Sequence, residues 1–415
     1  MRQSKLFGKT RKDISQDEKS INADLLTRAG FVEKQMAGVY NYLPLGLKVF
    51  RKIENIIREE INAIGGQEIL MPVLQTKELW EQTGRWTEME PIMYQFKDHH
   101  GSEIGLGTTH EEVVTDIVKK NIASYKDLPI YLYQIQTKFR DEKRAKSGLL
   151  RGREFGMKDL YSFHTSEADL DVYYKKAHNA YIKIFQRLGL ESFSVEASGG
   201  TISKKFSHEF MVINKAGEDL TVLCSKCLWA QNKEIATLQA GDKCPKCDQK
   251  LKEEKTVEAG NIFNLGTEYS NKMGLKFTDQ DGKQKNVVMG CYGIGLSRAM
   301  GTIVEANYDE GGIIWTKNTT PYQVHLLSFT KNDKKQKEIV GLYEQMKTEG
   351  LDVLFDDRDI SFSKKLIDAD LIGICWQLIV SDKQDKYELI DRKSHKSQLL
   401  DRETVIKTIK KFYNV

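Results

Sequence analysis

Four cysteines in the middle of the sequence have the spacing of metal ligands. Two CxxC pairs, separated by 16 residues, consist of Cys224, Cys227, Cys244 and Cys247. Two short turns that each present two thiolates can close a tetrahedral site, so this spacing predicts structural zinc in a small ribbon-like insertion. Because four cysteines leave no open coordination position, a catalytic metal is not expected there. The alternatives are a knuckle that has lost its metal and four free surface thiols.

Three other segments carry side chains that a nucleotide-activating site needs. In Phe139-Arg140-Asp141-Glu142 a fixed guanidinium can contact a phosphate or carboxylate through two hydrogen bonds, and a nearby acid can accept from an amine. In Arg153-Glu154-Phe155 the phenylalanine offers a flat surface to a base. From Gly290 to Arg298, glycines permit close packing of a strand against a helix start, with the arginine in the first helical turn. Taken singly, each segment has a plainer explanation as a surface ion-pair cluster or a packing turn.

Together, the order and spacing of these segments resemble motifs 2 and 3 of class II aminoacyl-tRNA synthetases. QIQTKFRDE and the return strand RGREFGMKDLYSFH, with THEE at 109–112, SHEF at 207–210 and MGCYGIG at 289–295, are similar to the bacterial type of prolyl-tRNA synthetase. The likeness runs through the whole chain apart from the cysteine segment. It implies ATP-dependent attachment of L-proline to tRNA(Pro) through a prolyl-adenylate. Pyrophosphate would leave in the first step, and a terminal ribose hydroxyl of tRNA would take the prolyl group in the second.

The resemblance assigns roles in the ATP site. The motif 2 arginine of the family, here Arg140, bridges the amino-acid carboxylate and the α-phosphate, where a preorganised cation stabilises the transition state. Arg298 would hold the γ-phosphate and, with Phe155, sandwich the adenine. Glu142 would accept from the adenine or substrate nitrogen, and Arg151 would belong to the ATP-binding set. Arg140 and Arg298 are therefore the expected catalytic residues.

The resemblance also assigns a proline site. Thr109 and Glu111 match the loop that binds the secondary amine of proline, and such an acceptor pair suits a cationic ring nitrogen. Arg140 would meet the proline carboxylate, while His208 and Cys291 would line the ring pocket. The alternative is that His208 is a satisfied core histidine and Cys291 a buried small hydrophobe.

A divalent cation and tRNA contacts follow from the same resemblance. Class II sites bend ATP around Mg²⁺, and Glu218 in the AGED run is a candidate ligand, although a solvated turn acid is the alternative. Lys143, Arg144 and Lys146 lie at the predicted tip of the motif 2 hairpin, which in the family reaches the acceptor end of tRNA. A solvated basic turn would have the same composition.

The segment between motifs 2 and 3 departs from the family. Bacterial prolyl enzymes usually carry a large insertion there that hydrolyses alanyl-tRNA, whereas here the stretch after 232–236 shrinks to a few dozen residues. A proline pocket rejects the smaller alanine by only about 1 to 3 kcal/mol, so we expect misactivation of alanine without editing in cis. A separate trans-editing protein, or tolerance of errors, would have to cover this. Smaller departures are found at Thr108, Asn261, Ser363 and Cys375.

Hydrophobic periodicity predicts the elements that would position these residues. It indicates helices over Pro44 to Ile64, over Thr109 to Ile122 with the threonine as N-cap, and over Leu170 to Leu188. Alternation along YLYQIQTKFR predicts a strand in a long antiparallel hairpin over Tyr131 to Phe163. From Thr320 onwards strands and helices alternate, which predicts a small α/β domain with a mostly parallel sheet.

The predicted fold class is α+β. A class II catalytic domain with an antiparallel sheet would occupy 1–221 and 257–318, with the zinc-ribbon-like insertion at 222–256. The α/β domain at 319–415 resembles the anticodon-binding domain of the class IIa subgroup, and Asp356-Asp357-Arg358 matches a family signature. Motif 1 around Pro72 would lie at a homodimer interface.

Composition sets the outer limits of these predictions. The chain has 415 residues, with 63 Lys and Arg against 59 Asp and Glu and 40% hydrophobic residues, which excludes disorder over its whole length. No stretch approaches the roughly 18 consecutive apolar residues of a membrane helix, and the start lacks the apolar region of a secretory signal. A cytoplasmic protein without a membrane partner is therefore expected. A net charge of +4 is too small to indicate nucleic-acid binding by itself.

Two other functions stay open at this point. One is a sister enzyme for threonine, serine or glycine, against which the THEE loop and the lack of a threonine-type metal set of His and Cys argue. The other is a non-catalytic synthetase paralogue that acts as a binding subunit. The intact Arg140, Glu142, Phe155 and Arg298 argue against it.

Overall fold

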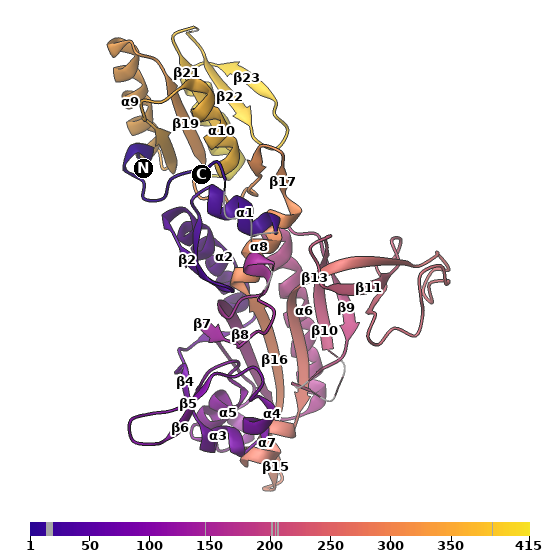
Figure 1. The fold of residues 1–415 in the computed structure, drawn as a ribbon. Coiled ribbons are helices and arrows are strands. Elements are labelled where there is room, and N and C mark those ends of the chain that lie inside the picture. Colours follow the sequence, from indigo (N-terminus) through magenta and orange to yellow (C-terminus); the bar gives the residue numbers. More distant parts are fainter. Residues whose placement is uncertain (14–19, 146, 201, 204, 206, 384) are drawn as a thin grey trace. The chain divides into compact units, whose positions relative to one another are not determined.

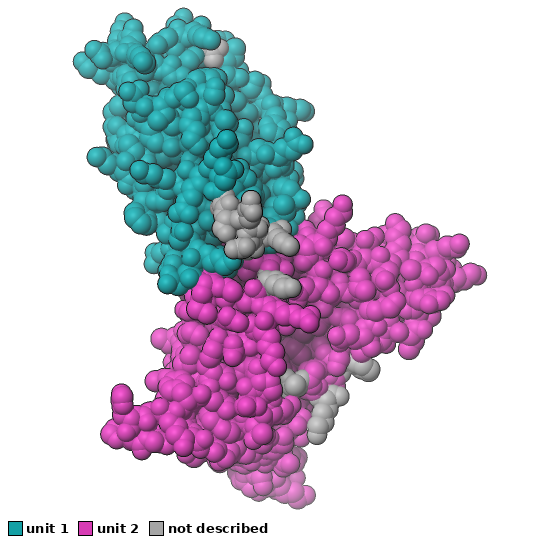
Figure 2. Space-filling view, viewed as in Figure 1, with its two compact units in different colours: residues 1–35, 40–52, 303–415 teal, residues 36–39, 53–302 magenta. Residues whose placement is uncertain are grey.

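The computed structural model describes residues 1–13, 20–145, 147–200, 202–203, 205, 207–383 and 385–415. These residues form two compact units, coloured separately in Figure 2. Unit 1 consists of residues 1–35, 40–52 and 303–415, and unit 2 of residues 36–39 and 53–302. Unit 1 therefore combines the start and the end of the chain, while the domain boundaries expected from the sequence stay a prediction. Among the described residues, no helix has the length and apolar character needed to cross a membrane.

A nine-stranded sheet organises unit 2 (Figure 1). Its order is β10-β9-β12-β11-β13-β16-β8-β7-β3, and only the β3–β7 and β9–β12 pairs are parallel. The strands are β3 (Gln67–Glu68), β7 (Ile130–Phe139), β8 (Glu154–His164), β9 (Ser192–Ala197), β10 (Ser207–Ile213), β11 (Asp219–Leu223), β12 (Ala230–Asn232), β13 (Lys252–Gly266) and β16 (Val288–Gly295). The predicted antiparallel sheet of a class II core is confirmed.

Strands β7 and β8 form the predicted long hairpin. Its register runs from Ile130 opposite Phe163 to Phe139 opposite Glu154. The backbone N–H of Arg140, just beyond β7, donates to the carbonyl of Arg153 at 2.9 Å, which continues the pairing past the end of the strand. The hairpin thus brings the end of motif 2 and the start of its return strand together, as the alternating sequence predicts.

Strand β16 places the third motif beside this hairpin. It pairs antiparallel with β8, Gly295 lying opposite Met157, and with β13, Ile294 lying opposite Gly260. Helix α8 (Leu296–Ala306) begins directly after β16, so Arg298 lies in its first turn as predicted. At Gly290 a Cβ atom would approach the Tyr292 hydroxyl to 2.5 Å, so the motif needs glycine there for close packing.

Helix α6 (Glu167–Leu188) packs against β8, β13 and β16 of this sheet. Its first turn is capped by the Ser166 hydroxyl, which accepts from the amide of Asp169, and it ends at Gly189 with a φ of 76°. Aromatic rings of Tyr181, Phe185 and Phe210 pack between the helix and the sheet. The helix extends three residues before the predicted start at Leu170.

Shorter elements complete unit 2. They are η2 (Tyr125–Asp127), η3 (Gly148–Leu150), α3 (Lys77–Glu81), α4 (Arg85–Glu88), α5 (Glu111–Lys119), α7 (Glu268–Met273), the sheet β4-β6-β5 (Leu74–Thr76, Glu103–Leu106, Gln95–Lys97) and the hairpin β14-β15 (Lys276–Thr278, Gln284–Asn286). The predicted N-cap of α5 was wrong. His110 occupies that position, because the Thr109 hydroxyl donates to the Glu111 carboxylate instead of accepting from the helix.

The C-terminal part of unit 1 consists of a five-stranded sheet and three helices. Its sheet has the order β20-β19-β21-β22-β23, with strands Val353–Asp356, Val324–Phe329, Trp376–Ser381, Tyr387–Asp391 and Ser397–Leu400. Helices α9 (Asp333–Thr348), α10 (Phe362–Ile372) and α11 (Arg402–Tyr413) agree with the predicted alternation. The prediction of a mostly parallel sheet was only half right, since β21, β22 and β23 pair antiparallel. The strand β23 has only four residues and is mostly exposed, so it lacks the alternation of buried and polar residues that predicts a strand.

The remaining elements lie in the N-terminal region and ahead of β19. They are η1 (Gln3–Lys5), α1 (Ile21–Arg28), β1 (Val32–Met36), β2 (Val39–Tyr42), α2 (Pro44–Ala63), β17 (Tyr308–Asp309) and β18 (Gly312–Ile313). The helix predicted from Pro44 is confirmed within one residue at its C-terminus.

Candidate active site

A cavity in unit 2 lies where β7, β8, β13 and β16 bring the three motifs together. Among its lining residues are Thr109, Glu111, Arg140, Glu142, Arg151, Phe155, Cys291 and Arg298. These residues come from four separate stretches of the chain, and the sequence predicted each of them as a site residue. Both predicted catalytic guanidinium groups thus face the same cavity.

Arg140 is a half-buried cation without a carboxylate partner among the described residues. Its guanidinium carbon lies 5.4 Å from the centre of the Phe155 ring, and its Nη2 donates weakly to the Thr108 carbonyl at 3.5 Å. The buried Nε has no hydrogen-bond partner in the described part of the chain. Burial, and next the charge of Arg298, lower the pKa of Arg140. An anionic ligand would relieve both the missing hydrogen bond and the repulsion between the two cations.

Arg298 is fixed by β13 and by η3. Its Nη1 is 2.9 Å from Glu258 Oε2, and its Nε donates to the Leu150 carbonyl at 2.8 Å. Sequence reasoning missed the role of Glu258, because a single acid on a polar strand looks like a solvated residue. About a third of the Arg298 side chain stays exposed, which leaves it accessible from the cavity.

Arg151 links two acids at the polar side of the cavity. Its Nε contacts Glu142 Oε2 at 2.9 Å and its Nη1 contacts Glu218 Oε2 at 2.7 Å. An adjoining polar cavity is lined by these three residues with Asp219, Glu258, Arg140 and Arg298 among others. Burial, followed by the charge of Glu258, raises the pKa of Asp219 to about 6. Carboxylate oxygens next to arginines suit a polyphosphate with a hard divalent cation.

The opposite end of the cavity holds a buried carboxylate. Glu111 is fully buried, accepts from the Thr109 hydroxyl, and lies with Oε1 3.3 Å from the Cys291 sulfur. Burial, and then Glu111 itself, raise the pKa of Cys291 well above its usual value, so the thiol stays protonated and donates. Apolar walls nearby are formed by Tyr161 and Phe263. This end offers an acceptor in a small, mostly apolar enclosure.

His208 is not among the residues that the structure brings to the cavity. Its Nδ1 lies 2.8 Å from the Tyr174 hydroxyl, and its ring packs edge-on against Tyr174 of α6. Burial lowers its pKa. Because successive strand residues face opposite sides of a sheet, the next residue, Glu209, instead contacts Asn261, which does line the cavity. The alternation of β10 was the signal that could have separated these two residues.

The basic turn of the motif 2 hairpin lies just outside the cavity. Lys143 and Arg144 are exposed in the segment between β7 and η3. The prediction for Lys146 lies outside the described residues.

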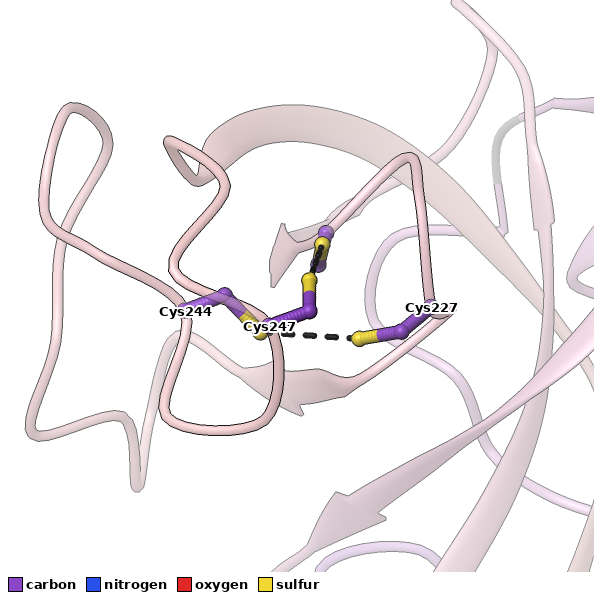
Figure 3. Close-up of side chains that lie close together, drawn as sticks. Cys227, Cys244 and Cys247 are labelled. Atoms are coloured by element: carbon purple, nitrogen blue, oxygen red, sulfur yellow. Dashed lines mark hydrogen bonds between the residues drawn. The ribbon is translucent and has the colours of Figure 1, made fainter.

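The four cysteines of the insertion converge on one another, and Figure 3 labels three of them, Cys227, Cys244 and Cys247. All four sulfurs lie within 4.8 Å of one another, with 3.4 Å between Cys224 and Cys247 and 3.5 Å between Cys227 and Cys244. A tetrahedral zinc site needs sulfurs about 3.8 Å apart. The backbone amide of Cys227 points at the Cys224 sulfur and is the main cause that lowers the pKa of this thiol to about 6. The cluster therefore fits a closed Cys₄ metal site.

The insertion is built into the main sheet. Strand β11 ends one residue before Cys224, and it pairs along β13 from Asp219 opposite Thr256 to Leu223 opposite Lys252. A small cluster of buried side chains around the cysteines includes Val222 and Leu251.

Comparisons with known proteins agree with this architecture. The model of the tRNA synthetase class II core domain (G, H, P, S and T) matches residues 94–307, and that of the anticodon binding domain matches residues 323–412. The curated proline–tRNA ligase of Sulfurihydrogenibium sp. (strain YO3AOP1) is 35% identical, with 99% of each chain covered. That of Syntrophus aciditrophicus (strain SB) is 34% identical over 92% of this chain and 93% of its own.

Solved structures share the fold at lower identity. The prolyl-tRNA synthetase of Cryptosporidium parvum, complexed with L-proline and AMP, has a TM-score of 0.77 at 17% identity, covering 95% of this chain and 75% of its own. The enzyme of Giardia lamblia in complex with prolyl-adenylate has a TM-score of 0.77 at 16% identity, covering 94% and 78%. The alignment with the Sulfurihydrogenibium protein runs over 560 positions against the 415 residues of this chain. That relative therefore carries segments without a counterpart here.

Proposed function

Because this chain belongs to the proline–tRNA ligase family of class II synthetases, we propose that it uses ATP to attach L-proline to tRNA(Pro) through a prolyl-adenylate. The observation that carries the proposal is one cavity lined both by Arg140 and Arg298, which we propose bind the phosphates, and by Thr109 and Glu111, which we propose bind the amine. Both substrates can thus meet on the Arg140 guanidinium. We place this reaction in the cytoplasm.

The proposed chemistry needs orientation and charge stabilisation by the chain. Glu111 and Thr109 hold the proline ring nitrogen, while Arg140 draws the ionised proline carboxylate towards the α-phosphorus of ATP. The carboxylate oxygen forms the new P–O bond, the bond to the β-phosphate oxygen breaks, and pyrophosphate leaves with that electron pair. Because the nucleophile is already ionised, no side-chain base is needed. Arg140 stabilises the charge that builds up on the α-phosphate oxygens.

The adenine and the phosphate tail have separate binding groups in this proposal. Phe155 and Arg298 take the two faces of the adenine, and Arg298 also reaches the γ-phosphate. Glu142 accepts from the adenine amine. When bound, Mg²⁺ supplies positive charge between the phosphates, and Glu218 with the neighbouring Asp219 would hold it, since their carboxylates are the hard ligands that this ion prefers.

The direct test is amino-acid-dependent pyrophosphate exchange. We expect proline to stimulate exchange far above threonine, serine and glycine, because the acidic, partly apolar end of the cavity suits a secondary amine in a ring. Stimulation by another of these amino acids would indicate a sister enzyme. No stimulation by any of them would indicate a non-catalytic paralogue.

The insertion at 222–256 is proposed to bind structural zinc through Cys224, Cys227, Cys244 and Cys247. The geometry of the four sulfurs supports this. The chain is further proposed to form a homodimer through motif 1 around Pro72, where Leu70 and Leu74 are 77% and 57% exposed. Lys143, Arg144 and Lys146 are proposed to contact the acceptor end of tRNA(Pro).

Editing in cis is proposed to be absent. The described part of the insertion is occupied by short strands and the cysteine turns, and the relatives align over more positions than this chain has residues. We expect alanine-dependent pyrophosphate exchange. Alanine lacks part of the proline ring, and this costs only about 1 to 3 kcal/mol of binding free energy in the pocket. We also expect no deacylation of added alanyl-tRNA(Pro) above the uncatalysed rate. Clear enzymatic deacylation would contradict this, whereas its absence leaves the task to a separate trans-editing protein or to tolerance of errors.

A further inference from the structure

Two neighbouring buried glutamates share one buried cation behind the amine end of the cavity. Glu111 and Glu112 are both fully buried, and the Arg85 side chain is nearly so, with 4% of the residue exposed. Arg85 Nη1 lies 2.9 and 3.1 Å from the two carboxylate oxygens of Glu112, but 3.7 Å from the nearer oxygen of Glu111. The guanidinium is therefore committed to Glu112.

The surroundings hold Arg85 and Glu112 in this arrangement. The Thr83 hydroxyl donates to Glu112 Oε1 at 2.7 Å, and the guanidinium carbon lies 5.1 Å from the Trp80 ring and 5.5 Å from the Tyr269 ring. Burial works against the charge of Arg85, yet the nearby carboxylates outweigh it and raise its pKa. Burial raises the pKa of Glu112, while the charge of Arg85 and the hydrogen bond from Thr83 oppose this shift. Neither Arg85 nor Glu112 lines the main cavity.

The hydrogen bonds that the Glu111 carboxylate accepts come from neutral donors, and the Arg85 cation stays 3.7 Å away. The two oxygens of Glu111 receive the Thr109 hydroxyl and the Cys291 thiol, and both groups line the cavity with it. Two carboxylates with one guanidinium leave one negative charge, and a buried charge without a cation is unfavourable. A ligand with a cationic nitrogen would complete the set, whereas a neutral ligand of the same shape would not.

We infer that Glu112 is a specificity-determining positioning residue, which keeps Arg85 away from Glu111 and so reserves Glu111 for the cationic secondary amine of the amino-acid substrate. This inference rests on the proposed function. It predicts an effect of charge at a residue that need not touch the substrate. Without the Glu112 charge, Arg85 Nη1, which lies 3.7 Å from Glu111 Oε2, needs only a small shift to form a hydrogen-bonded ion pair with Glu111.

The variant Glu112→Gln tests this, because it removes the charge and keeps the shape. In pyrophosphate exchange we expect KM for proline to rise roughly 10- to 100-fold, while KM for ATP stays within about twofold. Tetrahydrofuran-2-carboxylate, in which an ether oxygen replaces the ring nitrogen, serves as the uncharged probe. We expect its inhibition constant to change by less than about threefold. The selectivity for the charged ring thus falls in the variant.

Further variants separate this effect from a structural one. Glu112→Asp keeps the charge and should retain most of the affinity for proline. The double variant Arg85→Met with Glu112→Gln removes both charges and should bring KM for proline back towards the wild-type value, although it loses more contacts. Glu88→Gln, on the exposed side of α4, is the matched control and should change neither constant. Thermal unfolding of each protein reports whether it folds.

Several results would overturn the inference. One is an unchanged KM for proline in Glu112→Gln, and another is equal weakening of proline and of the uncharged probe, as loss of structure would cause. A double variant worse than Glu112→Gln would also overturn it. If Glu112→Gln does not fold, the Glu112→Asp variant and the double variant test the inference through KM for proline and the inhibition constant of the uncharged probe. Failure of the proposed function is distinct, since the wild-type protein would then show no proline-dependent exchange.

Discussion

Replacing Arg140 by alanine is expected to lower proline-dependent pyrophosphate exchange by roughly 10²- to 10³-fold, the loss found when one preorganised donor to a developing oxyanion is removed. The physical reason is the isolation of this cation. No described carboxylate neutralises it, its buried Nε lacks a partner, and the Phe155 ring lies against its face. The guanidinium is therefore available to bind the proline carboxylate and the α-phosphate. The measurement is the exchange rate at saturating ATP and proline.

The Arg140→Lys variant should recover only part of this rate, because an ammonium cannot bridge a carboxylate and a phosphate with a planar pair of donors. Arg187→Lys is the matched control: this arginine pairs with Glu59 and Glu60 on the surface of unit 2, and its conservative replacement should leave exchange unchanged. An Arg140→Ala protein that keeps its fold and exchanges within tenfold of the wild-type rate would contradict the assigned role.

Replacing Cys224 and Cys244 together by serine is expected to abolish zinc binding and to lower the free energy of unfolding by at least about 2 kcal/mol. The two serines remove one buried ligand from each turn, and a small insertion with few buried apolar side chains depends on its metal for closure. Zinc content per chain and thermal unfolding of the purified proteins measure this.

Cys375→Ser is the control, since this cysteine lies outside the cluster and donates to the Trp315 carbonyl, which a hydroxyl can also do. It should retain one zinc per chain. Less than about half an equivalent in the wild-type protein, purified without chelator, would remove the basis for structural zinc.

Local patterns explain why much of the core was predictable. The alternation of β7 and β8, the helical period of α6 and the start of α8 after β16 are properties of short stretches, and each appears as expected. The convergence of Arg140 and Arg298 was predictable because their segments resemble motifs 2 and 3, which form one site in the family. The paired CxxC turns likewise carry their own geometry, since each turn is local.

The features that could not be predicted from the sequence depend on which face of a sheet a side chain lies on, and on contacts between residues far apart in the chain. His208 and Glu209 differ by one position, yet only the register of β10 decides that Glu209 meets Asn261 while His208 meets α6. Arg85 precedes its partner Glu112 by 27 residues, and nothing in the pattern around it indicates an ion pair. Thr109 resembled a helix cap because capping is the commoner role of a threonine at that place.

Strand β13 serves two neighbours along a single edge, and this limits how the chain can be shortened. Residues 252–256 pair with β11 and residues 260–266 pair with β16 along this edge, whereas β10 pairs with residues 256–263 along the opposite edge. Deleting the insertion that carries the cysteines would leave residues 252–256 with unpaired backbone amides and carbonyls. Such an exposed strand edge can pair with strands of other molecules. By pairing with this edge, the insertion thus also protects the sheet from self-association. A shorter loop without a strand would leave the edge unpaired.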